Sequence, residues 1–451
     1  MKILKHQIFW ALLGIALVPI LLKLSGVVQR IFGIEIVPFA WIGLYWFVFC
    51  VVLSIQAAKD SIKKLVYAYV SVLPLCLGIG EVFLYTQSQK DVVAPDEILG
   101  FAHKPNASIH RIFRVDDEIV YDIQLNTDEN GLRVTTDTNK NYQKCIHFYG
   151  GSFTAGNGLN DSQTLPSSLA RVLDSRDISI MNYGISAAGV HTMLARLEFD
   201  RDSSIWNQCR ENVSFYIAIP HHIYRTFGVA GGPKYKLENG KAVYKGKISL
   251  EEKRKLERQN SVLEHTPLFT ITERLSNQFQ KSYIYKIFFN EYARSASLLA
   301  IPQYHNGYFS NPDLLHLNAT TDLDLYFTIL TRSYELLAQK YNSELIVILW
   351  DNDMHAEFLD KYDEAIKTFL RDKHIRFYTL SEIIPDYPKD LERVKAGDFE
   401  HFAYRISRWD THPNALANEL IAKFLADKID SGEITTRPTH ATSAQEVRDV
   451  E

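Results

Sequence analysis

Apolar residues change their spacing in a regular way along the chain from about residue 145 onward. Short apolar runs, which are typical of buried strands, alternate with longer runs in which apolar residues recur every three or four positions, which are typical of helices. The expected strands are 146–149, 178–181, 213–219, 345–350 and 375–379, and the expected helices are about 164–173, 190–199, 322–341, 356–371 and 414–428. This alternation predicts an α/β domain with a doubly wound parallel sheet.

The segments around this alternation have other patterns. Residues 96–135 alternate apolar and polar positions and contain an Asn130-Gly131 turn signal, so a β-rich segment is expected there after a polar stalk. An insertion at about 227–321 begins with an Asn239-Gly240 hairpin signal and continues through a charged helix into an aromatic-rich stretch. The polar tail is expected to be disordered. The expected divisions are 1–86, 87–144, 145–430 and 431–451.

The first 86 residues are much more apolar than the rest of the chain. Three stretches, Ile8–Val28, Val37–Ala58 and Leu65–Tyr85, are each close to the roughly 20 residues that cross a bilayer. They predict three transmembrane helices rather than a cleaved signal peptide, because no small-residue cleavage site follows the first stretch. Lysines before the first span and between the second and third place the N-terminus inside. We therefore expect a multi-pass protein of the inner (cytoplasmic) membrane, with the bilayer as a partner and the α/β domain on the periplasmic side.

Charge and cysteine content exclude some classes of protein. The net charge of the 451 residues is −4, so overall basicity gives no reason to expect nucleic-acid binding. Four cysteines are too few for a disulfide-dense scaffold. Cys145 and Cys209 each precede an expected strand, and they can form a bridge in an oxidising compartment or remain two small buried residues.

A Gly150-Gly151-Ser152 turn follows the expected strand 146–149. Glycine allows a tight turn that a residue with a Cβ would resist. Open α/β sheets bind ligands at the carboxyl ends of their strands. The Ser152 hydroxyl is therefore expected at such an edge, near backbone N–H groups that can face a developing negative charge. Ser152 is a candidate nucleophile, although an ordinary Gly-Ser turn would have the same sequence.

Near the C-terminus, Asp410 and His412 stand directly before the last expected helix, which Pro413 or Asn414 would start. A nucleophilic serine needs a base to take its proton and an acid to orient that base. The pKa of a histidine is suited to the first role, and Asp410 can accept a hydrogen bond from the other ring nitrogen. The alternative is a loop that only caps the helix.

These blocks resemble the SGNH/GDSL hydrolase family. Residues 150–156, Gly-Gly-Ser-Phe-Thr-Ala-Gly, resemble its first block, with Gly151 where that family usually has Asp. Residues 181–189 resemble its second block, and Asp410-x-His412 resembles its last, which is usually spaced Asp-x-x-His. The resemblance covers roughly residues 145–428. It implies a flavodoxin-like sheet, Ser152 as nucleophile, His412 as base and Asp410 as its orienting acid.

The resemblance also implies donors for an oxyanion. The backbone N–H of Gly189 is our choice, although Ala187 aligns as well. The third block of the family, Gly-x-Asn-Asp, is altered here, and His222 could donate an N–H in place of its asparagine. Arg225 could hold a carboxylate or phosphate of the substrate. The His221-His222 pair has no acidic or cysteine partner at ligand spacing, so we expect no metal, and the reaction needs no cofactor.

The resulting expectation is an SGNH-type serine acyl esterase or O-acyltransferase, anchored in the membrane, that acts on an envelope glycan or lipid ester through an acyl-enzyme. A membrane protein that donates the acyl group is a possible partner. The alternative is a non-catalytic protein that keeps the SGNH fold and binds or assembles envelope polysaccharide. A transport role for the three spans has little support, because their ionisable residues, Lys23 and Glu81, lie near the span ends.

Overall fold

The computed structural model divides the chain into two compact units. One unit comprises residues 92–261 and 303–451 and contains the α/β domain. The other, residues 1–91 and 262–302, includes a few described positions, all helical, at 46–48, 51, 72, 76 and 79. From residue 92 onward, the structure describes 92–115, 118–174, 177–226, 232–247, 319–351, 360–395, 402–407 and 409–438.

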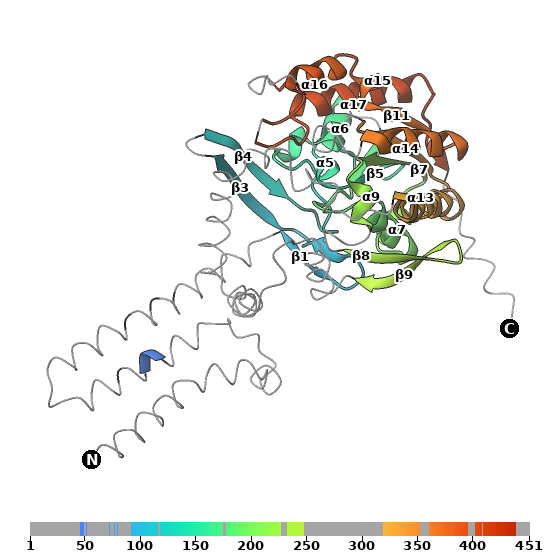
Figure 1. Cartoon of the computed structure of the whole chain (residues 1–451). Coiled ribbons are helices and arrows are strands. Elements are labelled where there is room, and N and C mark those ends of the chain that lie inside the picture. Colours follow the sequence, from blue (N-terminus) through green and yellow to red (C-terminus); the bar gives the residue numbers. More distant parts are fainter. Residues whose placement is uncertain are drawn as a thin grey trace, which may run out of the picture. The chain divides into compact units, whose positions relative to one another are not determined.

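Five parallel strands form the central sheet of this domain (Figure 1). They are β5 (Lys144–Gly150), β6 (Ile178–Asn182), β7 (Glu211–Ala218), β10 (Glu344–Leu349) and β11 (Phe377–Thr379). Their order across the sheet is β11-β10-β7-β5-β6, and every neighbouring pair among them is parallel. This is the flavodoxin-like order, in which the second strand lies on one side of the first and the later strands lie on the other. The parallel sheet predicted from the sequence is therefore present.

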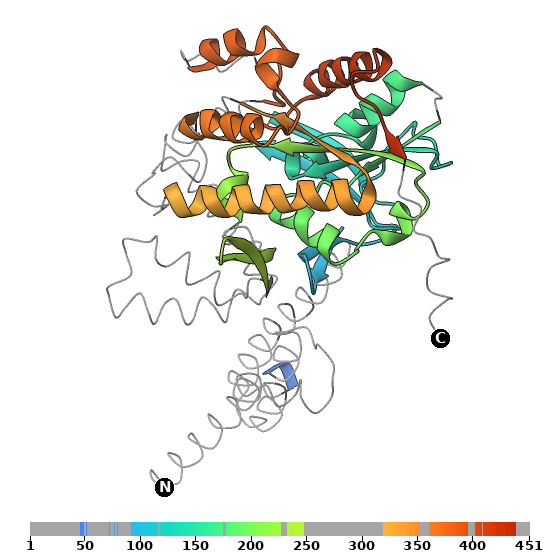
Figure 2. The ribbon, with the colours of Figure 1, turned by 90° about the vertical axis from the view of Figure 1, so that its right-hand side faces the viewer.

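Helices cover both faces of the sheet, as Figures 1 and 2 show for α6 and α17 on one side and α7 and α13 on the other. Residues of β10 divide between two buried cores: Leu345 and Val347 pack in one, and Ile346 and Ile348 in the other. Because both faces are covered, the strands are mostly apolar on both faces, which is why short apolar runs predicted them. The covering helices are α6 (Leu165–Leu173), α7 (Val190–Glu198), α13 (Ala319–Tyr341), α14 (Asp360–Asp372), α16 (Tyr387–Lys395) and α17 (Ala415–Asp430).

Several helices are too short to have been predicted from periodicity. Three of them begin close to the carboxyl ends of strands: α5 (Ser152–Ala155) after β5, α9 (His222–Arg225) after β7, and α15 (Leu380–Ile383) after β11. The others are α8 (Ser203–Trp206) and the 3₁₀ turn η1 (Asp161–Gln163).

Small antiparallel sheets precede and interrupt the domain. The segment expected to be β-rich forms β1 (Val93–Asp96) with β2 (Gly100–His103), and β3 (Ser108–Val115) with β4 (Glu118–Asn126). The expected Asn-Gly hairpin is confirmed as β8 (Pro233–Glu238) and β9 (Lys241–Lys247). The rest of the insertion up to residue 318 lies outside the described residues.

Two expectations about the ends of the domain need correction. Residues 92–95 were expected in a polar stalk, but Val92 is buried and β1 begins at Val93. The first residues of the tail are also ordered, because β12 (Arg437–Pro438) pairs antiparallel with β7. Residues 87–91 and 439–451 lie outside the described part.

Of the two alternatives for the cysteines of the α/β domain, the structure has the bridge. Cys145 at the start of β5 and Cys209 before β7 form a disulfide, with their Cα atoms 5.8 Å apart. Both residues are buried in the core on the α7 side of the sheet.

The prediction of three transmembrane helices is wrong. The three stretches fall almost entirely outside the described residues, and within the described part no helix has both the length and the apolar character to cross a bilayer. The longest described helix, α13, has 23 residues, but it carries charges such as Asp324, Arg332 and Glu335. The multi-pass inner-membrane localisation, with its periplasmic placement of the α/β domain, depended on these helices and is withdrawn with them. The bilayer as a partner stays a prediction.

Candidate active site

Ser152 and His222, two of the predicted site residues, follow the carboxyl ends of two neighbouring strands. β5 passes through Gly151 into α5, whose first residue is Ser152, and β7 leads to α9, whose first residue is His222. The sheet order reverses between these strands, since β6 lies on the far side of β5 from β7. Such a reversal is the point at which open α/β sheets bind their ligands.

Ser152 opens a helix of only four residues and is 5% exposed. The first bond within this helix runs from the Ala155 N–H to the Gly151 carbonyl, at 2.9 Å. The N–H groups of Ser152 and Phe153 precede that bond and have no acceptor in the helix. The helix ends at Gly156, whose φ of +73° is a conformation that favours glycine.

Gly151 has no room for a side chain. A Cβ at this position would lie 2.7 Å from Arg225 Nη1, 2.8 Å from the Ala188 carbonyl oxygen and 2.9 Å from His222 Nε2. The loops after β6 and β7 therefore approach the turn before Ser152 very closely. The space that a larger side chain, such as that of an aspartate, would need at this position is filled.

His222 is 1% exposed and its two ring nitrogens differ in their surroundings. Nδ1 lies 2.6 Å from the Tyr216 hydroxyl, whereas Nε2 has no hydrogen-bond partner among the described residues. Burial, reinforced by the nearby Arg225 guanidinium, holds the pKa of His222 well below its usual range. The imidazole is therefore neutral near pH 7. When Tyr216 donates to Nδ1, the proton of the ring is on Nε2, beside Gly151.

Gly189 lies in the loop after β6 and caps the N-terminus of α7. A Cβ on Gly189 would be 3.3 Å from His222 Cγ, so this residue lies against the histidine. Ala187, the alternative donor, has a φ of +66°. Gly184 instead approaches α5, because a Cβ there would lie 2.3 Å from the Ala155 nitrogen. Gly189 is thus next to His222, while Gly184 allows close packing on the serine helix.

Asp410 and His412 form a pair despite the shortened spacing. Asp410 Oδ1 lies 2.5 Å from His412 Nδ1 and also accepts the backbone N–H of His412 at 3.0 Å. The second contact places the carboxylate within its own loop, so an Asp-x-His spacing suffices to orient the ring. Asn414 caps α17 by accepting the Ala417 N–H at 3.0 Å, which confirms the expected start of this helix.

Phe153 connects the two halves of the candidate site. Its ring lies 5.4 Å from the His412 ring and 5.0 Å from the Trp350 ring, in edge-to-face arrangements. The imidazole is therefore next to the residue that follows Ser152. No hydrogen bond joins Ser152 to His412 within the described residues. The structure brings the two residues to one edge of the sheet without this contact, which is often long or poorly aligned in an enzyme without substrate.

The surroundings of Gly151 carry positive and neutral donors. Half-buried Arg225 donates from Nη1 to the Ala188 carbonyl at 2.8 Å. His191 is fully buried, and both of its ring nitrogens have no hydrogen-bond partner among the described residues. Burial and Arg225 lower the pKa of His191 to about 3. An anion that forms beside Gly151 would meet the Arg225 guanidinium and the neutral His222 imidazole.

A different group has the ligand atoms that metals prefer. Cys145, His147 and Cys209 are buried with their ligand atoms within 4.8 Å of one another. The two sulfurs are joined to each other. The His147 nitrogens lie 2.9 Å from Asn212 Oδ1 and 3.2 Å from the Tyr183 hydroxyl. These atoms are already engaged, so this group is part of the core.

Sequence reasoning missed two buried arginines near the site. Arg133 contacts the serine helix, and Arg405 donates to the Thr411 carbonyl at 2.5 Å, next to His412. Only their charge, within otherwise apolar or aromatic surroundings, distinguishes them in the sequence. No protein-family model matches the chain, and no curated protein matches it either.

Proposed function

We propose that the protein is a serine-dependent acyl esterase or O-acyltransferase of the SGNH type. The observation that carries the proposal is the Asp410–His412 pair, 2.5 Å apart, with its imidazole against the residue that follows Ser152. A serine, a histidine and an oriented carboxylate at one sheet edge are the parts that acyl transfer requires.

In this mechanism the Ser152 oxygen attacks the ester carbonyl while His412 Nε2 takes the serine proton. Asp410 holds the ring in the correct tautomer and stabilises the imidazolium. The carbonyl oxygen becomes an oxyanion and accepts hydrogen bonds from the N–H groups of Ser152 and Gly189 and from His222 Nε2. Collapse of the intermediate breaks the bond to the alcohol, which leaves with the proton from His412.

The acyl-enzyme then transfers its acyl group to water or to a sugar hydroxyl, activated by His412. We propose that Arg225 holds a carboxylate or phosphate of the substrate, and the position of its guanidinium beside Gly151 supports this. We propose a glycan or lipid ester as substrate on the family resemblance alone. Neither substrate requires membrane anchoring of this chain.

A serine-directed fluorophosphonate probe tests the nucleophile. We expect wild type to be labelled at Ser152, Ser152→Ala not to be labelled, and His412→Ala to be labelled at least about 100-fold more slowly, because general-base catalysis contributes this much. Ser203→Ala, which alters an exposed serine at the start of α8, is the matched control and should label normally. Equal labelling of wild type and Ser152→Ala would refute the proposal.

A non-catalytic binding role for polysaccharide is the second candidate. The missing Ser152–His412 hydrogen bond favours it, because a site that no longer needs catalysis need not keep this contact. Under this reading the purified protein does not hydrolyse short aryl esters, and Ser152→Ala retains full cellular function. Loss of cellular function in Ser152→Ala, with folding retained, would exclude it.

A further inference from the structure

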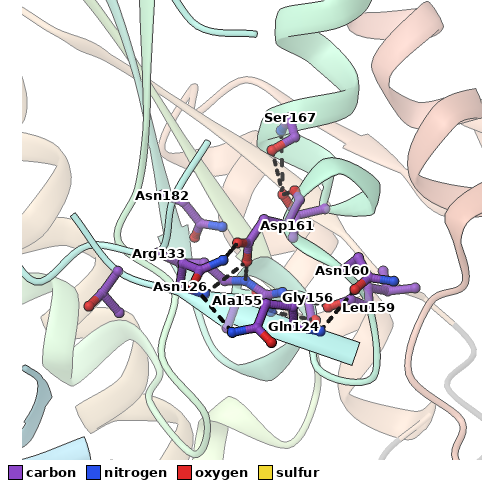
Figure 3. A network of polar contacts seen from close by, with 12 residues as sticks. Gln124, Asn126, Arg133, Ala155, Gly156, Leu159, Asn160, Asp161, Ser167 and Asn182 are labelled. Atoms are coloured by element: carbon purple, nitrogen blue, oxygen red, sulfur yellow. Dashed lines mark hydrogen bonds and ion pairs between the residues drawn. The ribbon is translucent and has the colours of Figure 1, made fainter. Parts of the chain in front are cut away.

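Arg133 is almost completely buried beside the helix that carries Ser152. It lies after β4, its exposed fraction is 1%, and its guanidinium reaches the loop after α5 (Figure 3). Nη1 donates to the carbonyls of Ala155 and Gly156 at 2.6 and 2.7 Å, and Nη2 donates to the Leu159 carbonyl at 2.5 Å. One side chain thus binds three backbone carbonyls at the C-terminal side of α5.

These contacts matter because α5 cannot be stable by itself. A helix of four residues has very few internal hydrogen bonds, here from the N–H groups of Ala155 and Gly156 to the carbonyls of Gly151 and Ser152. Isolated helices need at least about 12 residues to be marginally stable. Its last carbonyls have no partner within the helix. Arg133 supplies partners from one side, and Asn182 supplies another by donating from Nδ2 to the Thr154 carbonyl at 3.0 Å.

A carboxylate fixes the guanidinium in turn. Arg133 Nε donates to Asp161 Oδ1 at 3.1 Å, and Asn126 Nδ2 donates to Asp161 Oδ2 at 2.6 Å (Figure 3). A buried charge is tolerated when it is paired and hydrogen-bonded. The planar fork of an arginine can reach several acceptors at once, whereas a lysine ammonium is a compact charge.

We propose that Arg133 is a positioning residue for Ser152. The Ser152 carbonyl accepts hydrogen bonds from the N–H groups of Gly156 and Asn157 at 2.9 and 3.0 Å. These N–H groups belong to the same two peptide groups whose carbonyls, of Ala155 and Gly156, accept from Arg133. Arg133 is therefore connected to the serine backbone through hydrogen bonds on both sides of these peptide groups. We call the hydrogen bonds from Arg133 to the carbonyls of Ala155, Gly156 and Leu159 the clamp. Loss of the clamp lets α5 shift, and a displacement of about 1 Å can lower the rate of the catalysed reaction about 100-fold. The inference rests on the proposed function of Ser152, and it makes the β-rich segment before the domain a part of the catalytic site.

Arg133→Lys tests the clamp and Arg196→Lys is its matched control. Arg196 is also buried and paired with a carboxylate, donating to Asp202 Oδ1 at 2.6 Å, and its guanidinium lies over the Tyr183 ring rather than against α5. With a short aryl ester, we expect Arg133→Lys to lower kcat at least about tenfold and to change KM less than about twofold. Arg196→Lys should leave both constants within about twofold. Unchanged kcat in folded Arg133→Lys, or an equal loss in both variants, would overturn the inference.

Hydrogen exchange of the peptide that covers residues 152–160 provides a readout that does not require turnover. Arg133→Lys should speed exchange in this peptide, and Arg196→Lys should not. If wild type neither hydrolyses esters nor labels at Ser152, the proposed function fails, and this exchange alone decides whether Arg133 holds α5. Unchanged exchange in Arg133→Lys would overturn the clamp. If Arg133→Lys does not fold, the double variant Arg133→Gln/Asp161→Asn, which leaves no unpaired buried charge, takes its place in both measurements.

Discussion

At the scale of single residues, the turn before Ser152 is shaped by side chains and carbonyls from the segments that follow β6 and β7. Gly151 is a glycine because Arg225, Ala188 and His222 occupy the space of a Cβ. In the sequence, Gly151 and His222 were two separate departures from the motifs that the chain resembles. The structure relates them physically, since the histidine fills part of the volume that an aspartate at position 151 would need.

His222 is predicted to donate to the oxyanion. His222→Ala should lower kcat about 100-fold with little change in KM, because the loss of one such donor has an effect of this size. His222→Gln carries an N–H at a similar distance from the Cα atom and should recover part of the loss. Steady-state kinetics with an aryl ester measure both variants, and wild-type kcat in His222→Ala would remove this histidine from the mechanism.

His147 is predicted to make the fold sensitive to acid. It is fully buried and stacked on Trp206, and burial lowers its pKa to about 3. In the unfolded chain His147 binds a proton near pH 6.5, whereas in the folded chain it stays neutral down to about pH 3. The free energy of unfolding therefore falls as the pH drops from about 6.5 toward 3.

Urea unfolding at pH 7 and pH 5.5 measures this effect. Between these values His147 should account for about 1 kcal/mol of lost stability, and His147→Gln should remove that part of the pH dependence. An equal loss of stability in wild type and variant would contradict the assignment.

At the scale of elements, the pattern of apolar residues predicted the strands, which are buried on both faces, and the long helices, which bury one apolar stripe. The five parallel strands and helices such as α6 and α17 appear close to their expected bounds. α5 could not be predicted because four residues have no periodicity, and its carbonyls are bound by residues distant in the sequence, such as Arg133, which lies 22 positions from Ala155. The loop of His412 likewise has a contact distant in the sequence, because Arg405 donates to the hydroxyl of Tyr387, 18 positions away. Such contacts have no local signal in the sequence.

Asn414 is predicted to connect helix capping with placement of the Asp410–His412 loop. Its Oδ1 caps α17, while its Nδ2 donates to the carbonyls of Ala403 and Arg405 at 2.9 and 3.1 Å. Asn414→Ala should lose about 1 kcal/mol from the cap and also lower kcat. Asn414→Asp keeps an acceptor for the cap but loses both donated bonds, so it should lower kcat with less effect on the cap.

Thr379→Ala is the matched control for this prediction. Thr379 caps α15 by accepting the Glu382 N–H at 3.2 Å, and its own N–H donates to Glu382 Oε2 at 2.8 Å. The Thr379→Ala variant should lose about as much unfolding free energy as Asn414→Ala, measured by denaturant titration, and its kcat should be unchanged. If Asn414→Asp has wild-type kcat, the bonds to Ala403 and Arg405 do not place the loop.

At the scale of the whole molecule, the sequence predicted the parallel sheet but was wrong about the membrane helices. The sheet followed from alternating patterns that only a packed domain explains. The transmembrane helices were inferred only from the length and apolarity of three separate stretches, and no relation between the stretches supported the inference. No helix in the described part of the chain meets the requirement for crossing a bilayer. The bridge between Cys145 and Cys209 also needed the fold, because the two residues are 64 positions apart.

This disulfide is predicted to stabilise the domain as a whole. It joins the start of β5 to the segment before β7, and closing a loop of this length stabilises a fold by about 4 kcal/mol in the chain-entropy account, with 2–4 kcal/mol typical of measurements. The double variant Cys145→Ala/Cys209→Ala should therefore lose about 2–4 kcal/mol of unfolding free energy in a urea titration. A loss below about 0.5 kcal/mol would contradict this role.

The most direct measurement for the central claim is a crystal structure of the protein after reaction with a phosphonate ester probe. We predict a phosphorus atom bonded to the Ser152 oxygen and His412 Nε2 within about 3 Å of an oxygen of the adduct. The phosphonyl oxygen should face His222 Nε2 and the Gly189 N–H. An adduct on another residue, or a Ser152 adduct with His412 turned away from it, would contradict the account.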